Sequence, residues 1–373
     1  MAGHPELMTR ALQEAERARG RTRPNPMVGC VIAKGQRVIA VGYHVKAGAP
    51  HAELVALRRA GDAARGADVY VTLEPCDHVG RTGPCTVALI EAGVGRVFLG
   101  TKDPNPIVNG RGVRHLRRAG VPVHVGLLGR RCRELNEAYE HAMAHRRPFV
   151  VAKVAQSLDG RVATRGGESR WITGKAARRQ GHLLRNTHDG IVVGIATVLS
   201  DDPRLTCRMR GGRDPVRIVL DSQGRTPPTA ALVRATASSP APTWIFVGEN
   251  APQERCQRLC SAGAEVIPCP LGPEGRIDLD HFLAELWRRE LLSILIEGGP
   301  TVHGAFFDAQ AVQRLDAFVA PLVIGGQGAV ASVGGLGALG LGDAPRLRKV
   351  GMQRLGDDYH LWGYPVFSPP AGG

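Results

Sequence analysis

A histidine, a glutamate and two cysteines within one stretch constrain the fold of this chain more than any other feature. The segment Pro50-His51-Ala52-Glu53 is followed by Pro75-Cys76 and then by Cys85. One imidazole and two thiolates suit a Zn²⁺ ion whose fourth position stays open to water. We therefore predict His51, Cys76 and Cys85 as metal ligands, in a fold that brings three separate segments to one point.

Glu53 gives this predicted site a chemistry. We expect His51 and Cys85 at helix N-termini, where a thiol has a lowered pKa and stays ionised more easily. Glu53 lies two residues after the predicted ligand His51, so it can reach metal-bound water without being a ligand itself. This arrangement is what a hydrolytic zinc deaminase needs, with Glu53 as the catalytic proton carrier. The alternatives are a closed structural zinc site, or unrelated thiols and a surface histidine, and neither requires a glutamate at this spacing.

Helix and strand patterns alternate along both halves of the chain, which predicts two α/β layered domains. The segment AHRRP is short, charged and stopped by a proline, so we place a domain boundary there, with domains at 1–146 and 147–373. In the first half, helices are expected at 7–18, 51–60, 85–92 and 112–120, and strands at 28–33, 37–43, 68–76, 95–101 and 121–128. In the second half, helices are expected at 175–186 and after residue 299, and strands at 149–157, 189–196, 216–222, 243–248, 293–299 and near 316–326.

Composition narrows the class of protein. Hydrophobic residues make up 43% and charged residues 22%, which is typical of soluble globular proteins. No apolar run is long enough to span a bilayer, and the N-terminus lacks the apolar centre of a signal peptide. We therefore expect a cytoplasmic protein without a membrane partner.

The net charge of +14 suits nucleic acid, an anionic membrane surface or phosphorylated small molecules. Aromatic residues are only 5% of the chain and do not interleave with the arginines as stacking platforms would. The charge therefore indicates an arginine-rich surface, and no nucleic-acid partner is expected.

The residues around the predicted ligands resemble a known family. Nucleoside and tRNA deaminases usually have PCxxC, whereas eight residues separate Cys76 from Cys85 here. The sequence PCDHVGRTGPC, with TLE before it and NPMVG at 25–29, is similar to the deaminase half of the bacterial RibD family of riboflavin-biosynthesis proteins. That family usually has Ser at the position of Asp77, which is not a ligand. His78 is a rival ligand inside the loop, although three ligands are already supplied.

The resemblance continues through the second half and covers nearly the whole chain. It rests on the segments 153–161, 167–173, 196–208, 219–225 and 296–307. It implies a cytidine-deaminase-like three-layer domain followed by a dihydrofolate-reductase-like domain that binds NADPH.

The resemblance also implies roles for single residues. Lys153 and Glu297 are expected as catalytic residues that orient the sugar carbonyl for hydride transfer. The implied substrate contacts are Ser169, Arg185, Leu205, Arg208 and Glu297, and two arginines with a serine suit a phosphate. The implied NADPH contacts are Ala155, Trp171, Thr197, Asp201, Ser222, Gly299, Pro300, Thr301, Val302, His303, Gly304 and Ala305.

The activity implied is bifunctional. Zinc-dependent hydrolytic deamination of 2,5-diamino-6-(phosphoribosylamino)pyrimidinone is followed by NADPH-dependent reduction of its ribosyl chain to ribityl. The expected partners are this phosphorylated pyrimidine and further copies of the chain, as a homo-oligomer. One alternative is a nucleic-acid deaminase with a basic second module, and another is a metal-stabilised scaffold in which Glu53 is idle.

Two further patterns carry no predicted function. The run Gly335-Leu336-Gly337-Ala338-Leu339-Gly340 satisfies GxGxxG, but no clear strand precedes it and no amphipathic helix follows, so a surface loop is expected. Cys256, Cys260 and Cys269 lack a nearby histidine or a second CxxC and are interpreted as structural.

Overall fold

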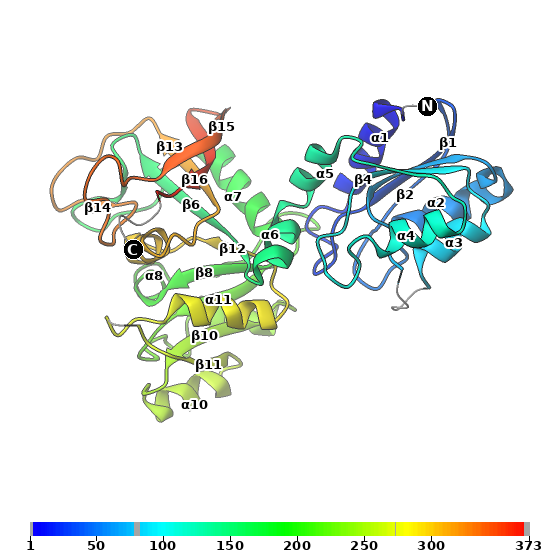
Figure 1. Ribbon diagram of the computed structural model, residues 1–373. Helices are drawn as coiled ribbons and strands as arrows, with labels where there is room; N and C mark the ends of the chain where they lie inside the picture. Colours follow the sequence, from blue (N-terminus) through cyan, green and yellow to red (C-terminus); the bar gives the residue numbers. More distant parts are fainter. Residues whose placement is uncertain (1–2, 78–82, 273, 369–373) are drawn as a thin grey trace. The chain divides into compact units, whose positions relative to one another are not determined.

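Two large sheets organise the chain, one in each of the two units Met1–Arg147 and Pro148–Gly373 (Figure 1). The computed structural model describes residues 3–77, 83–272 and 274–368. The predicted boundary between residues 146 and 147 lies one residue before this division.

The first unit has helices on both faces of a five-stranded sheet. The sheet order is β2 (Arg37–Tyr43), β1 (Gly29–Lys34), β3 (Asp68–Leu73), β4 (Arg96–Thr101) and β5 (Val123–Val125). The β1 strand is antiparallel to β2 and β3, whereas β3, β4 and β5 run parallel. The helices are α1 (Pro5–Glu16), α2 (Ala52–Ala60), α3 (Cys85–Glu91), α4 (Arg111–Arg118), α5 (Gly129–Leu135) and α6 (Glu137–His145), with a 3₁₀ turn at Gly61–Ala64.

Alternation along the strands explains the layers of this unit. Val31 and Tyr70 face a core shared with Met8 of α1 and residues of α5. Their strand neighbours Ile32 and Val71 face the opposite core, which α2, α3 and α4 cover. Successive strand side chains point to opposite faces, so the predicted three-layer α/β arrangement is confirmed.

Two glycines allow helices to lie directly on this sheet. A Cβ atom added to Gly29 of β1 would lie 1.9 Å from the carbonyl oxygen of Ala11 in α1. One added to Gly42 of β2 would lie 2.3 Å from the carbonyl oxygen of Ala52 in α2. At both positions the backbone of the helix touches the backbone of the strand.

The second unit is built on a nine-stranded mixed sheet. Its order is β11 (Glu265–Cys269), β10 (Thr243–Gly248), β9 (Val216–Leu220), β8 (Gly190–Gly194), β12 (Ser293–Ile296), β6 (Phe149–Ser157), β13 (Arg314–Ala320), β16 (Asp358–Val366) and β15 (Arg346–Leu355). All pairs from β11 to β13 are parallel, and β16 and β15 add an antiparallel edge. The central parallel strands β8 and β12 are buried on both faces, as parallel strands usually are, whereas the edge strand β11 is partly exposed.

Helices pack against this sheet and form two hydrophobic cores with it. Phe282 of α11 and Phe306 of α12 belong to one core, and Val198 of α8 and Leu259 of α10 belong to the other. The helices are α7 (Lys175–Thr187), α8 (Ile195–Asp201), α9 (Ala231–Arg234), α10 (Gln253–Ser261), α11 (Leu279–Arg288) and α12 (Pro300–Asp308), with a 3₁₀ turn at Ala235–Ala237 and a small sheet of β7 (Arg161–Ala163) and β14 (Val330–Ala331). No helix within the described residues is both long and apolar enough to cross a bilayer.

Several element boundaries differ from the sequence prediction. The strand expected at 121–128 is confined to Val123–Val125, because Pro122 has no N–H to donate and the backbone turns at Gly126. The strand expected at 189–196 ends at Gly194, since α8 begins at the next residue. The sequence interpretation left these elements unassigned: α5, α6, β7, α9, α10, β11, α11, β14, β15 and β16.

The glycine-rich stretch from 334 to 342 is irregular in structure, as expected. Leu336 and Leu339 are 87% and 101% exposed, yet the stretch is tied to α12. The backbone N–H of Leu336 donates to Asp308, and that of Gly334 donates to the carbonyl oxygen of Pro300. A GxGxxG dinucleotide site needs a strand that leads into it and a helix after it. Here only the two-residue β14 comes before the run, and the next element after it is the strand β15.

Candidate active sites

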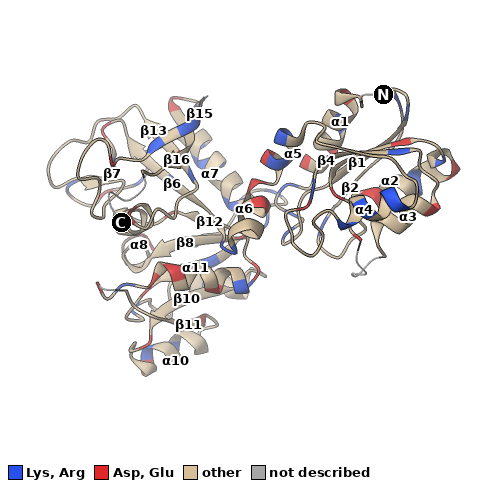
Figure 2. Ribbon diagram, viewed as in Figure 1, with Lys and Arg blue, Asp and Glu red and all other residues tan. Residues whose placement is uncertain are grey.

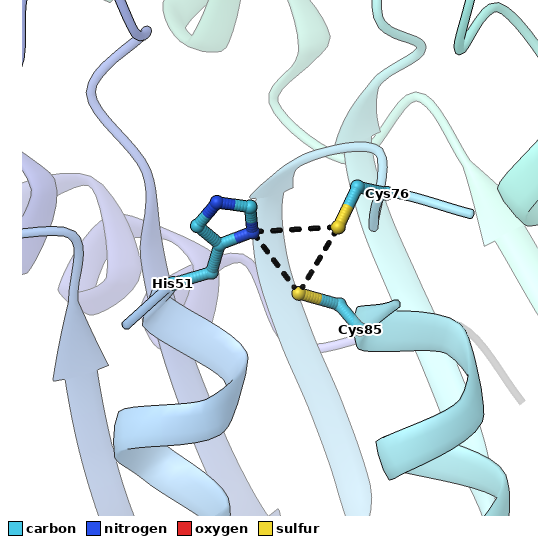
Figure 3. A group of neighbouring side chains, drawn as sticks. All are labelled: His51, Cys76 and Cys85. Atoms are coloured by element: carbon cyan, nitrogen blue, oxygen red, sulfur yellow. Dashed lines mark hydrogen bonds between the residues drawn. The ribbon is translucent and has the colours of Figure 1, made fainter. Parts of the chain in front are cut away.

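His51, Cys76 and Cys85 converge in the first unit (Figure 3). The Nδ1 atom of His51 lies 3.2 Å from the sulfur of Cys85 and 3.4 Å from that of Cys76, and the two sulfurs are 3.4 Å apart. Within the described residues this is the one group of three or more histidine, cysteine or acidic side chains placed to hold a metal ion.

Three secondary-structure ends position these side chains. His51 is the N-cap residue of α2, Cys76 follows the end of β3, and Cys85 is the first residue of α3. The backbone N–H of Thr86 donates to the carbonyl oxygen of Cys76, which fastens the loop after β3 to α3. Both expected helix starts are therefore present, within one residue.

The donor set fits zinc. Bonds of about 2.3 Å to sulfur and 2.1 Å to nitrogen place the ligand atoms of a tetrahedral zinc ion roughly 3.5 to 3.8 Å apart, so only a small expansion of the three atoms is needed. The hydrogen bond between the two thiols lowers the pKa of Cys76 to about 4 and raises the pKa of Cys85. One thiolate therefore forms readily, and metal binding displaces the proton shared by the pair.

Glu53 lies on the first turn of α2, beside this cluster, and is 3% exposed. Burial, followed by a negative charge on Cys76, raises the pKa of Glu53 to about 7. Glu53 is not among the clustered ligand atoms, as expected of a proton carrier. A carboxyl group that titrates near neutral pH can both take and give a proton there.

Two buried groups that the sequence interpretation did not assign support the ligand segments. His44 is 2% exposed, and its ring joins Asn25 Nδ2, at 3.1 Å, to the carbonyl oxygen of Pro50, at 3.2 Å. This chain of contacts fixes the residue before His51. The sequence offered one sign of this role, because His44 comes directly after the apolar strand RVIAVGY. Its partner Asn25 is the first residue of the NPMVG segment.

Glu74 has the second supporting role. Its carboxylate accepts hydrogen bonds from the backbone N–H groups of Asp103, Gly110 and Val113, at 3.2, 2.9 and 3.1 Å. It therefore ties the loop before α4 to the strand end that carries Cys76. In the sequence, Glu74 stands out only by its place in TLEPC. Its hydrogen-bond partners could not be inferred, because they lie about 30 to 40 residues away.

Asp77 points toward α4 rather than to the metal cluster. Its carboxylate accepts a hydrogen bond from Thr86 Oγ1 at 2.7 Å and contacts the ring of His115. His78, the rival ligand, lies outside the described residues.

The second unit has a cavity of about 290 Å³ that gathers most of the expected reductase residues. Lys153, Glu297 and the four other expected substrate contacts line it. So do Ala155, Trp171, Thr197 and Asp201 among the expected cofactor contacts. Ser222 and the turn 299–305 lie outside this lining.

Glu297 is the electrostatic centre of the cavity. Arg185 Nε and Nη2 each donate to a different oxygen of this carboxylate at 2.8 Å, and Lys153 Nζ approaches it at 3.4 Å. Burial alone would raise the pKa of Glu297, but the charges of Arg185 and Lys153 outweigh it and hold this pKa well below its usual range. Arg185 Nη1 donates to the carbonyl oxygen of Thr206, so this guanidinium is directed at protein groups.

Arg208 is an exposed cation of the same cavity. Burial and the positive charges of Arg185 and Arg204 lower the pKa of Arg208. Its Nε lies 3.3 Å from Nε2 of His182, a residue that the sequence interpretation missed. Burial, followed by the charges of Arg185 and Arg208, lowers the pKa of His182 to about 4, so its ring is neutral at pH 7. An anion beside Arg208 would relieve the repulsion between these cations.

Several of the expected cofactor contacts follow the carboxyl ends of parallel strands. Thr197 follows β8, Ser222 follows β9, and the turn 299–305 follows β12. Gly299 caps α12 without a side-chain hydrogen bond, and a Cβ on it would lie 3.7 Å from Thr197 Oγ1. Pro300 has no N–H, and those of Val302 and His303 donate to the carbonyl oxygen of Gly299. The N–H of Thr301 is therefore the donor at this helix start that suits a dinucleotide phosphate, so the turn fits the group.

The rest of that turn is covered. Val302 and His303 are buried, and a Cβ on Gly304 would lie 2.3 Å from the backbone of Gly334. The exposed part of the turn is its beginning, at Thr301. Trp171 is 65% exposed, with the guanidinium of Arg178 4.3 Å from its ring centre.

Charge is distributed over both units. Both basic and acidic residues occur in each unit, and α4 and β15 carry basic residues without acidic ones (Figure 2). This distribution agrees with the arginine-rich surface expected from the sequence.

Comparison with known proteins adds a family context. A model of the cytidine and deoxycytidylate deaminase zinc-binding region matches residues 1–101, and a model of the RibD C-terminal domain matches residues 148–361. The riboflavin biosynthesis protein RibD of Bacillus amyloliquefaciens is 39% identical over 359 residues, which are 96% of this chain and 95% of that protein.

Solved structures agree with these matches. The structure of Acinetobacter baumannii RibD is similar with a TM-score of 0.86 and 36% identity, over 97% of this chain and 98% of that chain. A Thermotoga maritima structure, named as a diaminohydroxyphosphoribosylaminopyrimidine deaminase/5-amino-6-(5-phosphoribosylamino)uracil reductase, is similar with a TM-score of 0.84 and 34% identity, over the same shares.

Proposed function

Because this chain belongs to the RibD family of riboflavin biosynthesis proteins, we propose that its two units act in turn on one phosphorylated pyrimidine. The enzyme is a hydrolase and an oxidoreductase. Its first reaction is the hydrolytic deamination of 2,5-diamino-6-(phosphoribosylamino)pyrimidinone, and its second reduces the ribosyl chain to ribityl with NADPH. The observation that carries the proposal is the convergence of His51, Cys76 and Cys85 beside a buried Glu53.

In the deaminase unit, His51, Cys76 and Cys85 would hold a zinc ion. When bound, it would supply Lewis acidity that lowers the pKa of a water molecule. Glu53 takes the proton that the attacking water loses and passes it to the amino group that leaves as ammonia. Its burial beside the ligands keeps bulk water from competing for that proton.

In the reductase unit, bound NADPH would supply the hydride for reduction of the sugar carbon. Lys153 faces the cavity with its ammonium group held by Glu297, and it orients the sugar carbonyl and donates a proton to its oxygen. Glu297 remains ionised because two cations contact it, so its role is to position Lys153. Arg208 and Ser169 bind the substrate phosphate, since both line the cavity and Arg208 lacks the carboxylate contact that Arg185 has.

One assay tests the proposal directly. The purified protein, given the phosphoribosylamino-pyrimidine, zinc and NADPH, should release ammonia and then oxidise NADPH. Ammonia release without NADPH oxidation would restrict the activity to deamination, and neither signal would contradict the proposal. We also expect a homo-oligomer that acts in the cytoplasm, without a nucleic-acid or membrane partner.

Changing Arg208 to Ala should weaken the reductase step. Loss of a charge-assisted hydrogen bond to phosphate lowers kcat/KM for the deaminated substrate by roughly 10 to 150-fold. Zinc content and ammonia release should not change. Arg210→Ala is the matched control, because Arg210 is exposed on the same loop and does not line the cavity.

The nucleic-acid alternative gives a different result in the same experiment. Labelled tRNA and single-stranded DNA are titrated at two salt concentrations. Submicromolar binding that weakens steeply with salt, together with unchanged reductase kinetics in the Arg208 variant, would favour that alternative.

The two activities should separate at the domain boundary. A fragment that starts at Arg147 is expected to fold and to oxidise NADPH with the deaminated substrate, because each unit has its own sheet and its own cores. Circular dichroism and NADPH absorbance measure this. An insoluble fragment, beside a fully active whole chain, would mean that the units depend on each other for folding.

A further inference from the structure

A second cavity in the reductase unit has no role in the function proposed so far. It has a volume of about 280 Å³ and lies between the loop after β9 and the helix α10. Its described lining residues include three arginines and no carboxylate: Gly224, Arg225, Thr226, Pro227, Pro228, Arg255 and Arg258. Three guanidinium groups around one cavity, without an acidic residue in the lining, indicate a site for an anion.

The loop that carries Arg225 is held rigidly. Asp221 is fully buried, and one of its oxygens accepts hydrogen bonds from the backbone N–H and the hydroxyl of Thr226, at 2.7 and 2.8 Å. The N–H of Gly224 donates to the carbonyl oxygen of Asp221, which closes the turn. Gly224 has a φ of +60°, so a glycine suits this turn. The backbone of Arg225 is therefore fixed before any ligand arrives.

The helix on the other side is tied to the same loop. Arg255 Nη1 donates to the carbonyl oxygen of Gln223 at 3.2 Å. Arg258 lies 3.9 Å from Glu254 on its own helix, and both side chains are largely exposed. The loop and α10 thus form one preassembled basic site, in which each guanidinium still has free N–H donors.

The position of this cavity relates it to the cofactor. Along the sheet, the strand order β6, β12, β8, β9 and β10 places the expected contacts Ala155, Gly299, Thr197 and Ser222 in a row. Neighbouring strands are about 4.8 Å apart, so the row spans roughly 14 Å, a length that suits an extended dinucleotide. The basic cavity begins with Gly224, two residues beyond Ser222, at the end of the row away from the substrate cavity.

NADPH differs from NADH by one phosphate, on the 2′ oxygen of its adenosine ribose. A cofactor that followed the implied contacts, with its nicotinamide in the cavity beside Lys153, would have its adenosine end toward β9 and β10, because these strands come last in the row. We propose that Arg225, Arg255 and Arg258 bind this 2′-phosphate and make the reductase select NADPH over NADH. The inference rests on the proposed reductase function and adds the residues that set its cofactor preference.

The test measures binding to the full-length protein by calorimetry, without the pyrimidine substrate. Arg225→Ala and Arg255→Ala should each raise the Kd for NADPH about 10-fold or more and change the Kd for NADH less than about twofold. Adenosine 2′,5′-bisphosphate and adenosine 5′-monophosphate provide a second pair of probes. The two variants should bind the bisphosphate more weakly than the wild type does, and the monophosphate equally well. Arg354→Ala, an exposed change on β15 at the opposite edge of the sheet, is the control.

Each outcome decides the question. Wild-type protein that prefers NADPH, with variants that keep this preference, would overturn the inference and leave the reductase function intact. Equal losses of NADPH and NADH would mean that these arginines support the fold or the pyrophosphate, which also overturns it. Wild-type protein that binds neither dinucleotide would contradict the reductase function itself.

Discussion

Glu53→Gln is expected to abolish deamination while the protein keeps its zinc. The amide cannot take a proton from water or return one to the leaving amine. General acid–base groups typically contribute 10² to 10⁴-fold to a rate, or about 3 to 5 kcal/mol of the barrier. The three ligand atoms belong to other residues, so the metal should remain bound.

Metal analysis and an ammonia assay on the same sample measure this effect. Glu91→Gln is a matched control, because Glu91 is an exposed carboxylate at the end of α3 in the same unit. NADPH oxidation with the deaminated substrate reports on the second unit and should be unchanged. Loss of zinc together with activity would mean that Glu53 is a ligand.

Glu297→Gln should have the largest effect on the second unit. The change leaves the guanidinium of Arg185 and the ammonium of Lys153 without their shared counter-charge, and these side chains are only 16% and 19% exposed. Breaking a buried ion pair in this way costs about 3 to 5 kcal/mol of the free energy of unfolding. The reductase reaction should also be lost, since Lys153 no longer has a partner to orient it.

The loss of stability should depend on pH in a defined direction. The pKa of Glu297 is lowered in the folded protein, so its stabilising contribution is complete above the pKa of the unfolded chain, about 4.5. Below that pH the unfolded chain takes up a proton first, and the difference between wild type and variant shrinks. Denaturant unfolding at pH 7 and at pH 3.5 measures this.

Glu249→Gln is the control for this experiment, because Glu249 is exposed in the same unit. An equal difference at both pH values, or no loss of stability at pH 7, would mean that Glu297 is not held as an ion pair with Arg185 and Lys153.

Local patterns predicted part of this structure well. The strands at 149–157 and 243–248 and the helix starts near His51 and Cys85 follow from apolar periodicity and from the spacing of the ligands. Metal ligands are unusually easy to find in a sequence, because zinc demands a few residue types in fixed numbers.

Other features depend on contacts between distant residues. Arg185 and Glu297 are 112 residues apart, and in the sequence Arg185 is indistinguishable from a surface arginine. The pattern of β15 is almost entirely exposed, so no apolar alternation marks it as a strand. The short helices α5 and α6 lie in a charged segment to which the sequence interpretation assigned no element.

The close contact between Gly42 and α2 has a consequence for the metal centre. Because strand and helix backbones touch there, the missing methyl group sets the height of α2 above the sheet. That helix carries Glu53 and begins directly after His51, whereas Cys76 and Cys85 are attached to β3 and α3. Any side chain at position 42 would lift one half of the metal centre away from the other. The tolerance of the catalytic geometry is therefore set by a glycine of β2, a residue without any chemistry of its own.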